Sequence, residues 1–368
     1  MTIPVRLGVV QRVLPTYRTA FFDALAAVCP EGLGVFAGQP RAREMIAAAN
    51  GMQLARLNRA QNRHLFNGPA YLCLQQGLLV WLANWQPGVL ILEANPRYLS
   101  SPAAVRWMHR RGRGVIGWGL GSPQLGGGLR RWLRRQFLAQ FDAVISYSRA
   151  GRTQYAALGL AADRIFVAPN AVMPRPTHPL PDRANPTGPL TVLFVGRLQP
   201  RKRIDLLLRA CAALPADLKP HLRIVGDGPA RAELGQLAAE LYPAAEFLGA
   251  RHGAELAPVF AAADLLVLPG TGGLAVQEAM TFGLPVIAAE GDGTQDDLVR
   301  PENGWRVQPG DLAALTSTLA GALGAPARLR RMGAESYRIV ATEINLEQMV
   351  AGFEQAVHFV LEQRQCTP

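Results

Sequence analysis

VLFVGRLQPRKRIDLLL, at residues 192–208, is the stretch that decides the fold. It begins as a strand that is apolar on both faces, turns at a glycine, and continues as a helix with apolar residues at helical spacing. Basic residues fill the turn and the beginning of the helix. A buried strand followed directly by a helix is the repeating unit of an α/β fold with a parallel sheet.

The same unit recurs along the chain, which has 368 residues. The short apolar runs are 5–10, 32–38, 88–93, 114–119, 142–148 and 164–170 in the first half, and 190–196, 221–228, 245–249, 264–270 and 284–289 in the second. Helical patterns lie between them, for example at 203–214, 229–241, 273–282 and 311–323. A chain of this length is too long to fold around a single hydrophobic core, so two doubly wound, Rossmann-like domains are predicted.

A proline-rich segment separates the two series of strands. Residues 173–189 hold six prolines and are predicted to be an interdomain linker. The N-terminal domain is therefore placed at 1–172 and the C-terminal domain at 190–345. Residues 346–368 contain a further amphipathic helix, which is expected to pack back on the first domain. Two such domains bind ligands at the carboxyl ends of their strands, here in a cleft between them.

Two cations follow the strand at 190–196. Gly196 ends the strand, Arg197 follows it, and Lys202 stands at the beginning of the next helix. Both cations are expected to project into the cleft at the carboxyl edge of the sheet, where an Arg fork and a Lys point charge suit a diphosphate. The alternative is a solvated basic helix start.

A glycine-rich turn precedes a second helix of interest, at 273–282. Gly272, Gly273 and Leu274 open that helix and offer main-chain amides to an anion. Glu278 lies one turn further and is placed to accept hydrogen bonds from a ribose diol. Each feature alone is also typical of an ordinary turn and an ordinary surface glutamate.

Taken together, these motifs resemble a known family. GRL-x3-K, then GDGP at 226–229, then GGLAVQEAM-x2-GLPVIA, in this order, are similar to the retaining glycosyltransferases of family 4. LPTYRTAFFDAL at 14–25 resembles the opening of one branch of that family. The resemblance implies the GT-B fold, two Rossmann-like domains facing across a cleft, with the donor in the second and the acceptor in the first. It implies catalytic roles for Arg197 and Lys202, and donor binding by Gly196, Asp227, Gly272, Gly273, Leu274 and Glu278.

The chain departs from the family at two positions. The family has a glutamate eight residues before Glu278, where this chain has Gly270, and many relatives have a histidine where this chain has Leu120. No side-chain base replaces either group. In the family the leaving phosphate helps to deprotonate the acceptor, so activity is still expected. The alternative is a degenerate protein that binds nucleotide sugars without turnover.

Acceptor-side candidates in the first domain are assigned by position only. Tyr17 and Arg18 follow the first strand, and Glu93 ends a later one, so all three are expected at the carboxyl edge of the sheet. Structural roles for them are equally compatible with the sequence.

Charge divides the chain unevenly. Residues 1–180 carry 21 arginines and six acids, and no acid occurs from Ala94 to Phe141. Residues 126–141, GGGLRRWLRRQFLAQF, predict an interfacial helix that binds an anionic membrane surface through Arg130, Arg131, Arg134 and Arg135. The alternative is that Trp132, Leu133 and Phe137 pack into the domain. Nucleic acid is not expected, since no nucleic-acid module is present and the second half is acidic.

The predicted function is transfer of a sugar, with retention, from a nucleoside diphosphate sugar to a hydroxyl. UDP is the first guess for the nucleotide and GDP the second, and the acceptor is expected to be lipid-linked or part of a cell-surface glycan. No metal or cofactor is implied. The four scattered cysteines favour a cytoplasmic protein. The basic helix at 126–141 predicts that it is peripheral on the inner face of the membrane. A sugar-nucleotide epimerase on the same scaffold is a further alternative.

Overall fold

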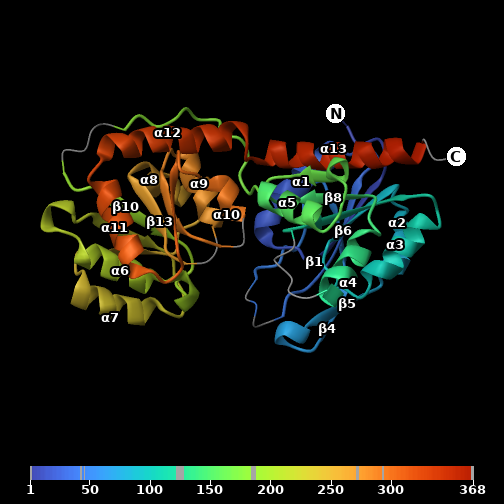
Figure 1. Ribbon diagram of the computed structural model, residues 1–368, viewed down its shortest axis with the longest axis horizontal. Coiled ribbons are helices and arrows are strands. Elements are labelled where there is room, and N and C mark those ends of the chain that lie inside the picture. Colours follow the sequence, from blue (N-terminus) through green and yellow to red (C-terminus); the bar gives the residue numbers. More distant parts are fainter. Residues whose placement is uncertain are drawn as a thin grey trace. The chain divides into compact units, whose positions relative to one another are not determined.

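Alternating apolar strands and helices produce two separate parallel sheets in this computed structural model. It describes residues 2–41, 44, 46–121, 128–183, 188–270, 273–291 and 294–365. Unit 1 comprises Met1–Val172 with Leu346–Pro368, and unit 2 comprises Met173–Asn345 (Figure 1). Each is a Rossmann-like α/β unit, as the alternating pattern predicts.

Unit 1 has a seven-stranded sheet in the order β3-β2-β1-β6-β7-β8-β9, with every neighbouring pair parallel. Its strands are β1 (Leu7–Val13), β2 (Leu33–Gly38), β3 (Arg56–Arg59), β6 (Val89–Glu93), β7 (Gly114–Gly119), β8 (Ala143–Ser146) and β9 (Ile165–Val167). Its helices are α1 (Thr19–Ala27), α2 (Leu78–Trp85), α3 (Ser101–His109), α4 (Gly128–Leu138), α5 (Arg149–Ala157) and α13 (Leu346–Gln365). An antiparallel hairpin, β4 (Gln61–Leu65) with β5 (Leu72–Gln76), is inserted after β3.

Unit 2 has a six-stranded parallel sheet in the order β12-β11-β10-β13-β14-β15. Its strands are β10 (Thr191–Val195), β11 (His221–Val225), β12 (Glu246–Gly249), β13 (Leu265–Leu268), β14 (Val286–Ala289) and β15 (Gly304–Val307). Its helices are α6 (Ile204–Ala213), α7 (Arg231–Leu241), α8 (Ala257–Ala261), α9 (Leu274–Thr281), α10 (Thr294–Leu298), α11 (Leu312–Leu323) and α12 (Pro326–Thr342).

Both sheets reverse their strand order beside their first strand. The reversal lies between β1 and β6 in unit 1 and between β10 and β13 in unit 2. In open α/β sheets ligands bind outside the carboxyl ends of the strands at such a switch point. The topology therefore defines one candidate binding edge in each unit.

The last helix, α13, belongs to unit 1 and packs on α1, β7, β8 and β9. Its Phe353 ring lies 4.9 Å from the rings of both Phe21 and Trp118. Near its end, Arg364 donates to Asp142 at 2.8 Å. The apolar face predicted for this helix thus completes the core of the first unit. Figure 1 shows α13 running along this unit.

The described part of the proline-rich segment lies along unit 2. Arg183 donates to the carbonyl oxygens of Phe260 at 3.1 Å and Phe282 at 2.8 Å, and also to that of Ala263. The ring of His178 lies 5.1 Å from that of Phe282. A segment predicted only as a spacer is therefore fastened to one unit by specific contacts.

Among the helices that the structure describes, none combines the length and apolarity needed to cross a bilayer.

Candidate functional site

The loops that follow β10 and β11 are joined by main-chain contacts at the switch point of unit 2. The Leu198 amide donates to the Asp227 carbonyl at 2.9 Å, and the Gly196 amide donates to the Val225 carbonyl at 3.0 Å. Gly226 has φ +139°, and a Cβ there would collide with the Gly196 carbonyl oxygen. Glycine at 226 thus permits a close approach that brings the GRL and GDGP motifs together.

The two predicted cations differ in their surroundings. Arg197 is exposed, whereas Lys202 is partly buried at the end of the short turn Pro200–Lys202 that precedes α6. Burial, together with the neighbouring Arg201 cation, lowers the pKa of Lys202 to about 8. The ammonium form still predominates at neutral pH, but its charge is poorly solvated. Its attraction for a bound anion is therefore stronger than that of a fully solvated lysine.

The surroundings of Gly270 explain why the chain departs from the family pattern at this position. It follows β13, is buried, and lies against the main chain of the turn before α6. A Cβ at position 270 would stand 2.7 Å from the Lys202 Cα and would collide with the Arg201 carbonyl oxygen. The backbone of Arg201 and Lys202 therefore occupies the place into which a side chain at 270 would extend.

Helix α9 carries the remaining predicted donor residues. Gly273 is its N-cap, Leu274 is exposed on its first turn, and Glu278 is partly buried one turn later. Burial raises the pKa of the Glu278 carboxyl above its usual value. The prediction for Gly272 lies outside the described residues. The topology places α9 directly after β13, on the same edge of the sheet as the β10 loop.

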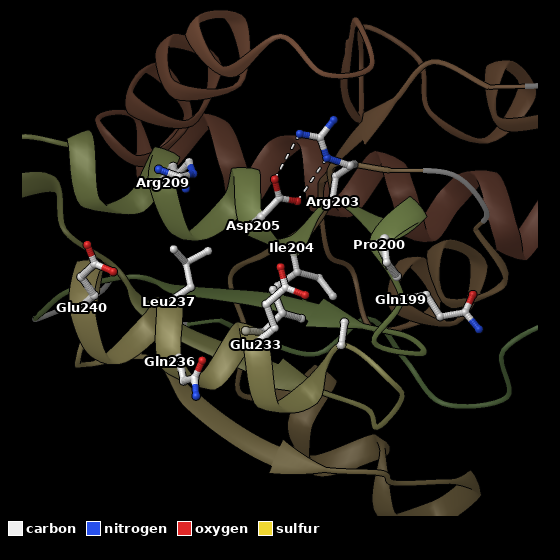
Figure 2. Close-up of a pocket in the computed structure, with 12 residues that line it drawn as sticks. Gln199, Pro200, Arg203, Ile204, Asp205, Arg209, Glu233, Gln236, Leu237 and Glu240 are labelled. Carbon is white, nitrogen blue, oxygen red and sulfur yellow. Dashed lines mark hydrogen bonds and ion pairs between the residues drawn. The ribbon is translucent and has the colours of Figure 1, made fainter.

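A hollow of about 550 Å³ lies between α6 and α7 (Figure 2). It is lined by Gln199, Pro200, Ile204, Arg209, Glu233 and Leu237, among others, and by the ion pair Arg203–Asp205 at 3.1 Å. Arg197, Lys202 and Glu278 do not line it. The predicted donor residues therefore do not line this hollow, which the turn Pro200–Lys202 borders through Pro200.

In unit 1, Glu93 stands at the switch point between β1 and β6. Its Oε1 accepts a hydrogen bond from the Arg12 amide at 2.6 Å, and the Tyr98 hydroxyl also bonds to it. Desolvation nevertheless raises the pKa of this carboxyl, so it is more easily protonated than an exposed glutamate. A carboxyl with a raised pKa at a strand end can exchange a proton with a hydroxyl ligand.

The other two acceptor-side candidates have different environments. Tyr17 is exposed, but Arg18 is only 7% exposed. The Arg18 guanidinium donates to Asn170 Oδ1 at 2.5 Å and lies over the rings of Trp118 at 5.6 Å and Tyr147 at 5.4 Å. Arg18, which follows β1, thus contacts β7 and the segments that follow β8 and β9. Tyr17 and Glu93 are both less buried than Arg18.

The apolar residues of helix α4 differ in their burial. Phe137 and Leu138 are buried, whereas Leu129, Trp132 and Leu133 are between 53% and 70% exposed. Among its arginines, Arg134 turns inward and donates to the Gly121 carbonyl at 3.2 Å, while Arg130, Arg131 and Arg135 are exposed. The alternative of complete packing into the domain holds for Phe137 but not for Trp132 or Leu133.

One buried polar residue beside the site was not predicted from the sequence. Gln277 precedes Glu278 in α9 and is only 1% exposed. The available signal was an amide side chain between Val276 and Ala279, at a position where the helical period places a core residue.

Two Rossmann-like units, each with a switch point beside its first strand, define the class of GT-B proteins. The family model described as "Glycosyl transferases group 1" matches residues 189–324, and the one described as "Glycosyl transferase 4-like domain" matches residues 9–171. The chain belongs to the family-4 glycosyltransferases.

Named relatives and a solved structure agree with this family. The chain is 43% identical over 122 residues to a GDP-mannose-dependent alpha-mannosyltransferase of Mycobacterium tuberculosis, covering 32% of this chain and 30% of that protein. It is 34% identical over 220 residues to a D-inositol 3-phosphate glycosyltransferase of Nocardia farcinica, covering 54% and 49%. The chain thus matches half or less of the length of these relatives. Anabaena HepE, solved in complex with UDP, shares the fold with a TM-score of 0.66 and 17% identity over 96% of this chain and 98% of that one.

Proposed function

We propose that this protein transfers a sugar from a nucleoside diphosphate sugar to a hydroxyl acceptor, with retention at the anomeric carbon and without a metal. The observation that carries the proposal is the switch point of unit 2, where the β10 and β11 loops are joined and a half-buried Lys202 lies beside the end of β13. UDP remains the first nucleotide to test and GDP the second. A relative named for GDP-mannose and a structural neighbour solved with UDP support including both.

The proposed chemistry uses the charges at this edge. The bond between the anomeric carbon and the phosphate oxygen breaks, a bond to the acceptor oxygen forms on the same face, and the acceptor proton passes to the leaving phosphate. Arg197, Lys202 and the amides at Gly273 and Leu274 stabilise the charge that develops on the diphosphate. Glu278 holds the ribose hydroxyls. Tyr17 and Glu93 contribute to the acceptor side in unit 1.

A donor panel tests this proposal. UDP-, GDP-, ADP- and dTDP-sugars are each assayed for slow hydrolysis and for thermal stabilisation of the protein. One donor is expected to be hydrolysed, and Glu278→Ala is expected to weaken its binding roughly ten- to a hundredfold, since a hydrogen bond to a charged group contributes about 1.5–3 kcal/mol. The exposed Glu302 provides the matched control, and Glu302→Ala is expected to bind normally. Absence of binding by every donor contradicts the proposal.

A nucleotide-sugar-binding protein without turnover is the second candidate. It is favoured by Gly270, where the main chain of Arg201 and Lys202 leaves no room for the carboxylate that the family places there. The same panel separates the two functions. Stabilisation by a donor without hydrolysis, and without transfer when lipid acceptors are supplied, would support the binding protein.

We further propose that α4 binds an anionic membrane on the cytoplasmic side, so that a lipid-linked acceptor is within reach. Leu129, Trp132 and Leu133 expose apolar surface among the cations Arg130, Arg131 and Arg135. Exposed aromatic and aliphatic residues between arginines suit the boundary between lipid headgroups and acyl chains. Arg134 is excluded from this surface, because it is partly buried and donates to the Gly121 carbonyl. Arg131 donates to the Ala157 carbonyl at 2.8 Å but is exposed.

Flotation with vesicles of phosphatidylglycerol and phosphatidylcholine measures this interaction. Each cation near an anionic surface contributes about 1 kcal/mol, so changing Arg130, Arg131 and Arg135 together to glutamine is expected to weaken partitioning on the order of a hundredfold. The control is Leu79→Ser with Val80→Ser, which removes exposed apolar side chains from α2, a helix without charged residues. A wild-type protein that does not float with anionic vesicles removes the membrane proposal and leaves the donor chemistry untouched.

A further inference from the structure

Gln277 occupies an unusual place in unit 2. It lies in the middle of α9, immediately before Glu278, and its side chain is buried. Successive side chains on a helix point about 100° apart, so Gln277 and Glu278 are directed to different surroundings. A buried amide needs several hydrogen-bond partners, because leaving its polar atoms without partners destabilises the fold.

The described partners of the Gln277 amide are the main chain at both connections between the units. Its Oε1 accepts from the Met173 amide at 3.2 Å, and its Nε2 lies 3.4 Å from the Met173 carbonyl and donates to the Ile344 carbonyl at 2.7 Å. Met173 is the first residue of unit 2 on one connection, and Ile344 is the penultimate residue of unit 2 on the other. One side chain thus joins the two segments by which the chain enters and leaves this unit.

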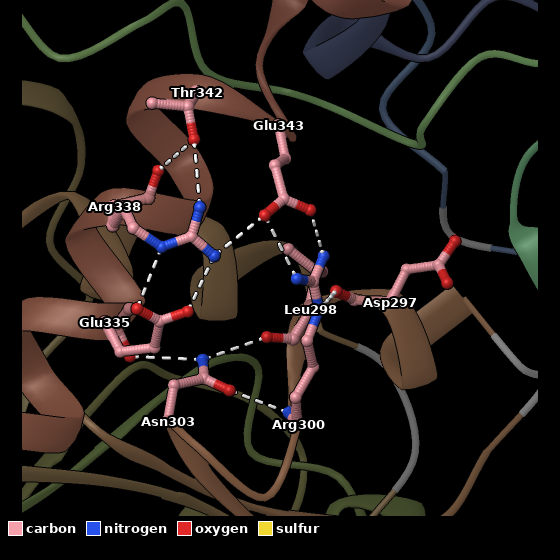
Figure 3. A network of polar contacts seen from close by, with 9 residues as sticks. Asp297, Leu298, Arg300, Asn303, Glu335, Arg338, Thr342 and Glu343 are labelled. Carbon is pink, nitrogen blue, oxygen red and sulfur yellow. Dashed lines mark hydrogen bonds and ion pairs between the residues drawn. The ribbon is translucent and has the colours of Figure 1, made fainter.

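Neighbouring side chains fasten the second connection to the body of unit 2. Glu343 accepts from Arg300 at 2.7 Å and from Arg338 at 2.8 Å (Figure 3). Asn345 is fully buried and donates to the carbonyls of Val340 at 2.9 Å and Ala341 at 3.2 Å at the end of α12. These contacts fix the connection to α12, whereas Gln277 fixes both connections to α9.

We infer that Gln277 is a positioning residue that couples nucleotide binding on α9 to the two connections between the units. The inference rests on the proposed function, which assigns the nucleotide to Glu278. A ligand that engages Glu278 restrains α9, and the hydrogen bonds of Gln277 carry that restraint to the Met173 amide and the Ile344 carbonyl. Leucine at 277 would fill much of the same volume but would leave these two main-chain groups without their amide partner.

Hydrogen–deuterium exchange of the full chain tests the coupling, with UDP and GDP as probes. In the wild type, the nucleotide that binds is expected to slow amide exchange at residues 172–173 and 343–347 roughly tenfold. Gln277→Leu is expected to bind the same nucleotide within about threefold, since Glu278 and Lys202 remain, yet to lose the slowing at both connections. Transfer assays on this variant are expected to show a lower kcat with a nearly unchanged donor KM.

Tyr242→Phe is the matched control, because the Tyr242 hydroxyl donates a buried hydrogen bond to the Pro220 carbonyl at 2.6 Å, away from both connections. It is expected to lower the melting temperature much as Gln277→Leu does and to keep the nucleotide-dependent slowing. Nucleotide binding with unchanged exchange in the wild type, or with full slowing in Gln277→Leu, overturns the coupling alone. If neither nucleotide binds the wild type, the proposed function fails and the coupling fails with it.

Discussion

Lys202→Ala is expected to lower the rate of sugar transfer about a hundred- to a thousandfold, the loss typical of removing one group that stabilises developing charge. Lys202 stands in the turn before α6, between the ends of β10 and β13. Its partial burial weakens solvent screening, so its attraction for the leaving diphosphate is stronger than that of an exposed lysine. The measurement is kcat/KM for the donor identified by the panel.

The chain contains one other lysine, which serves as the control. Lys219 is exposed and its Nζ donates to the Ala212 carbonyl at 3.2 Å, so Lys219→Ala is expected to leave transfer unchanged. A wild-type rate in Lys202→Ala would remove Lys202 from the catalytic residues.

The pKa of Lys202 adds a diagnostic dependence on pH. Because this pKa is lowered to about 8, the ammonium form of the free protein is lost as the pH rises through about 8, and donor affinity is expected to fall there. In Lys202→Arg the guanidinium stays charged, so this alkaline decrease should be absent.

Gly270→Ala and Gly270→Glu are expected to damage the donor site rather than to restore the family pattern. Any side chain at 270 meets the main chain of Arg201 and Lys202, which would have to move and take Lys202 with it. Overpacking of this kind costs about 1–3 kcal/mol. The melting temperature is expected to fall, and donor affinity to fall at least tenfold, a factor that corresponds to about 1.4 kcal/mol.

Gly321 is the matched control for Gly270. It lies in α11, and a Cβ there meets nothing within 4 Å, so Gly321→Ala is expected to be neutral or to stabilise the fold by about 0.4–1 kcal/mol. Calorimetry and donor titration on the three variants provide the comparison. A Gly270→Glu protein with wild-type stability and faster transfer would mean that the chain has merely lost a carboxylate that it could still accommodate.

Much of the architecture was predictable because buried parallel strands leave a strong local signal. The run predicted at 114–119 is β7, and that at 284–289 includes β14. β3, with the sequence RLNR, was missed because an edge strand need not be apolar. β4 and β5 form a two-stranded hairpin outside the main sheet, and their polar alternation resembles a loop.

The candidate site was predictable only in part. Arg197, Lys202 and Glu278 could be assigned from motif spacing, and their catalytic and donor-binding roles stay predictions. The sequence could not show that Arg18 is a buried structural residue, because its hydrogen-bond partners Asn170 and Met349 lie 152 and 331 residues away along the chain. Nothing in the periodicity of α4 distinguishes the buried Phe137 from the exposed Trp132.

The sequence by itself determined two Rossmann-like units, their order, and the motifs at the ends of β10, β11 and β13, because strand burial and helical period are local properties of the chain. Only the tertiary structure shows why position 270 is glycine and which main-chain segments Gln277 hydrogen-bonds to. Both depend on main-chain atoms brought together from distant parts of the chain, and main-chain atoms carry no sequence signature of their own.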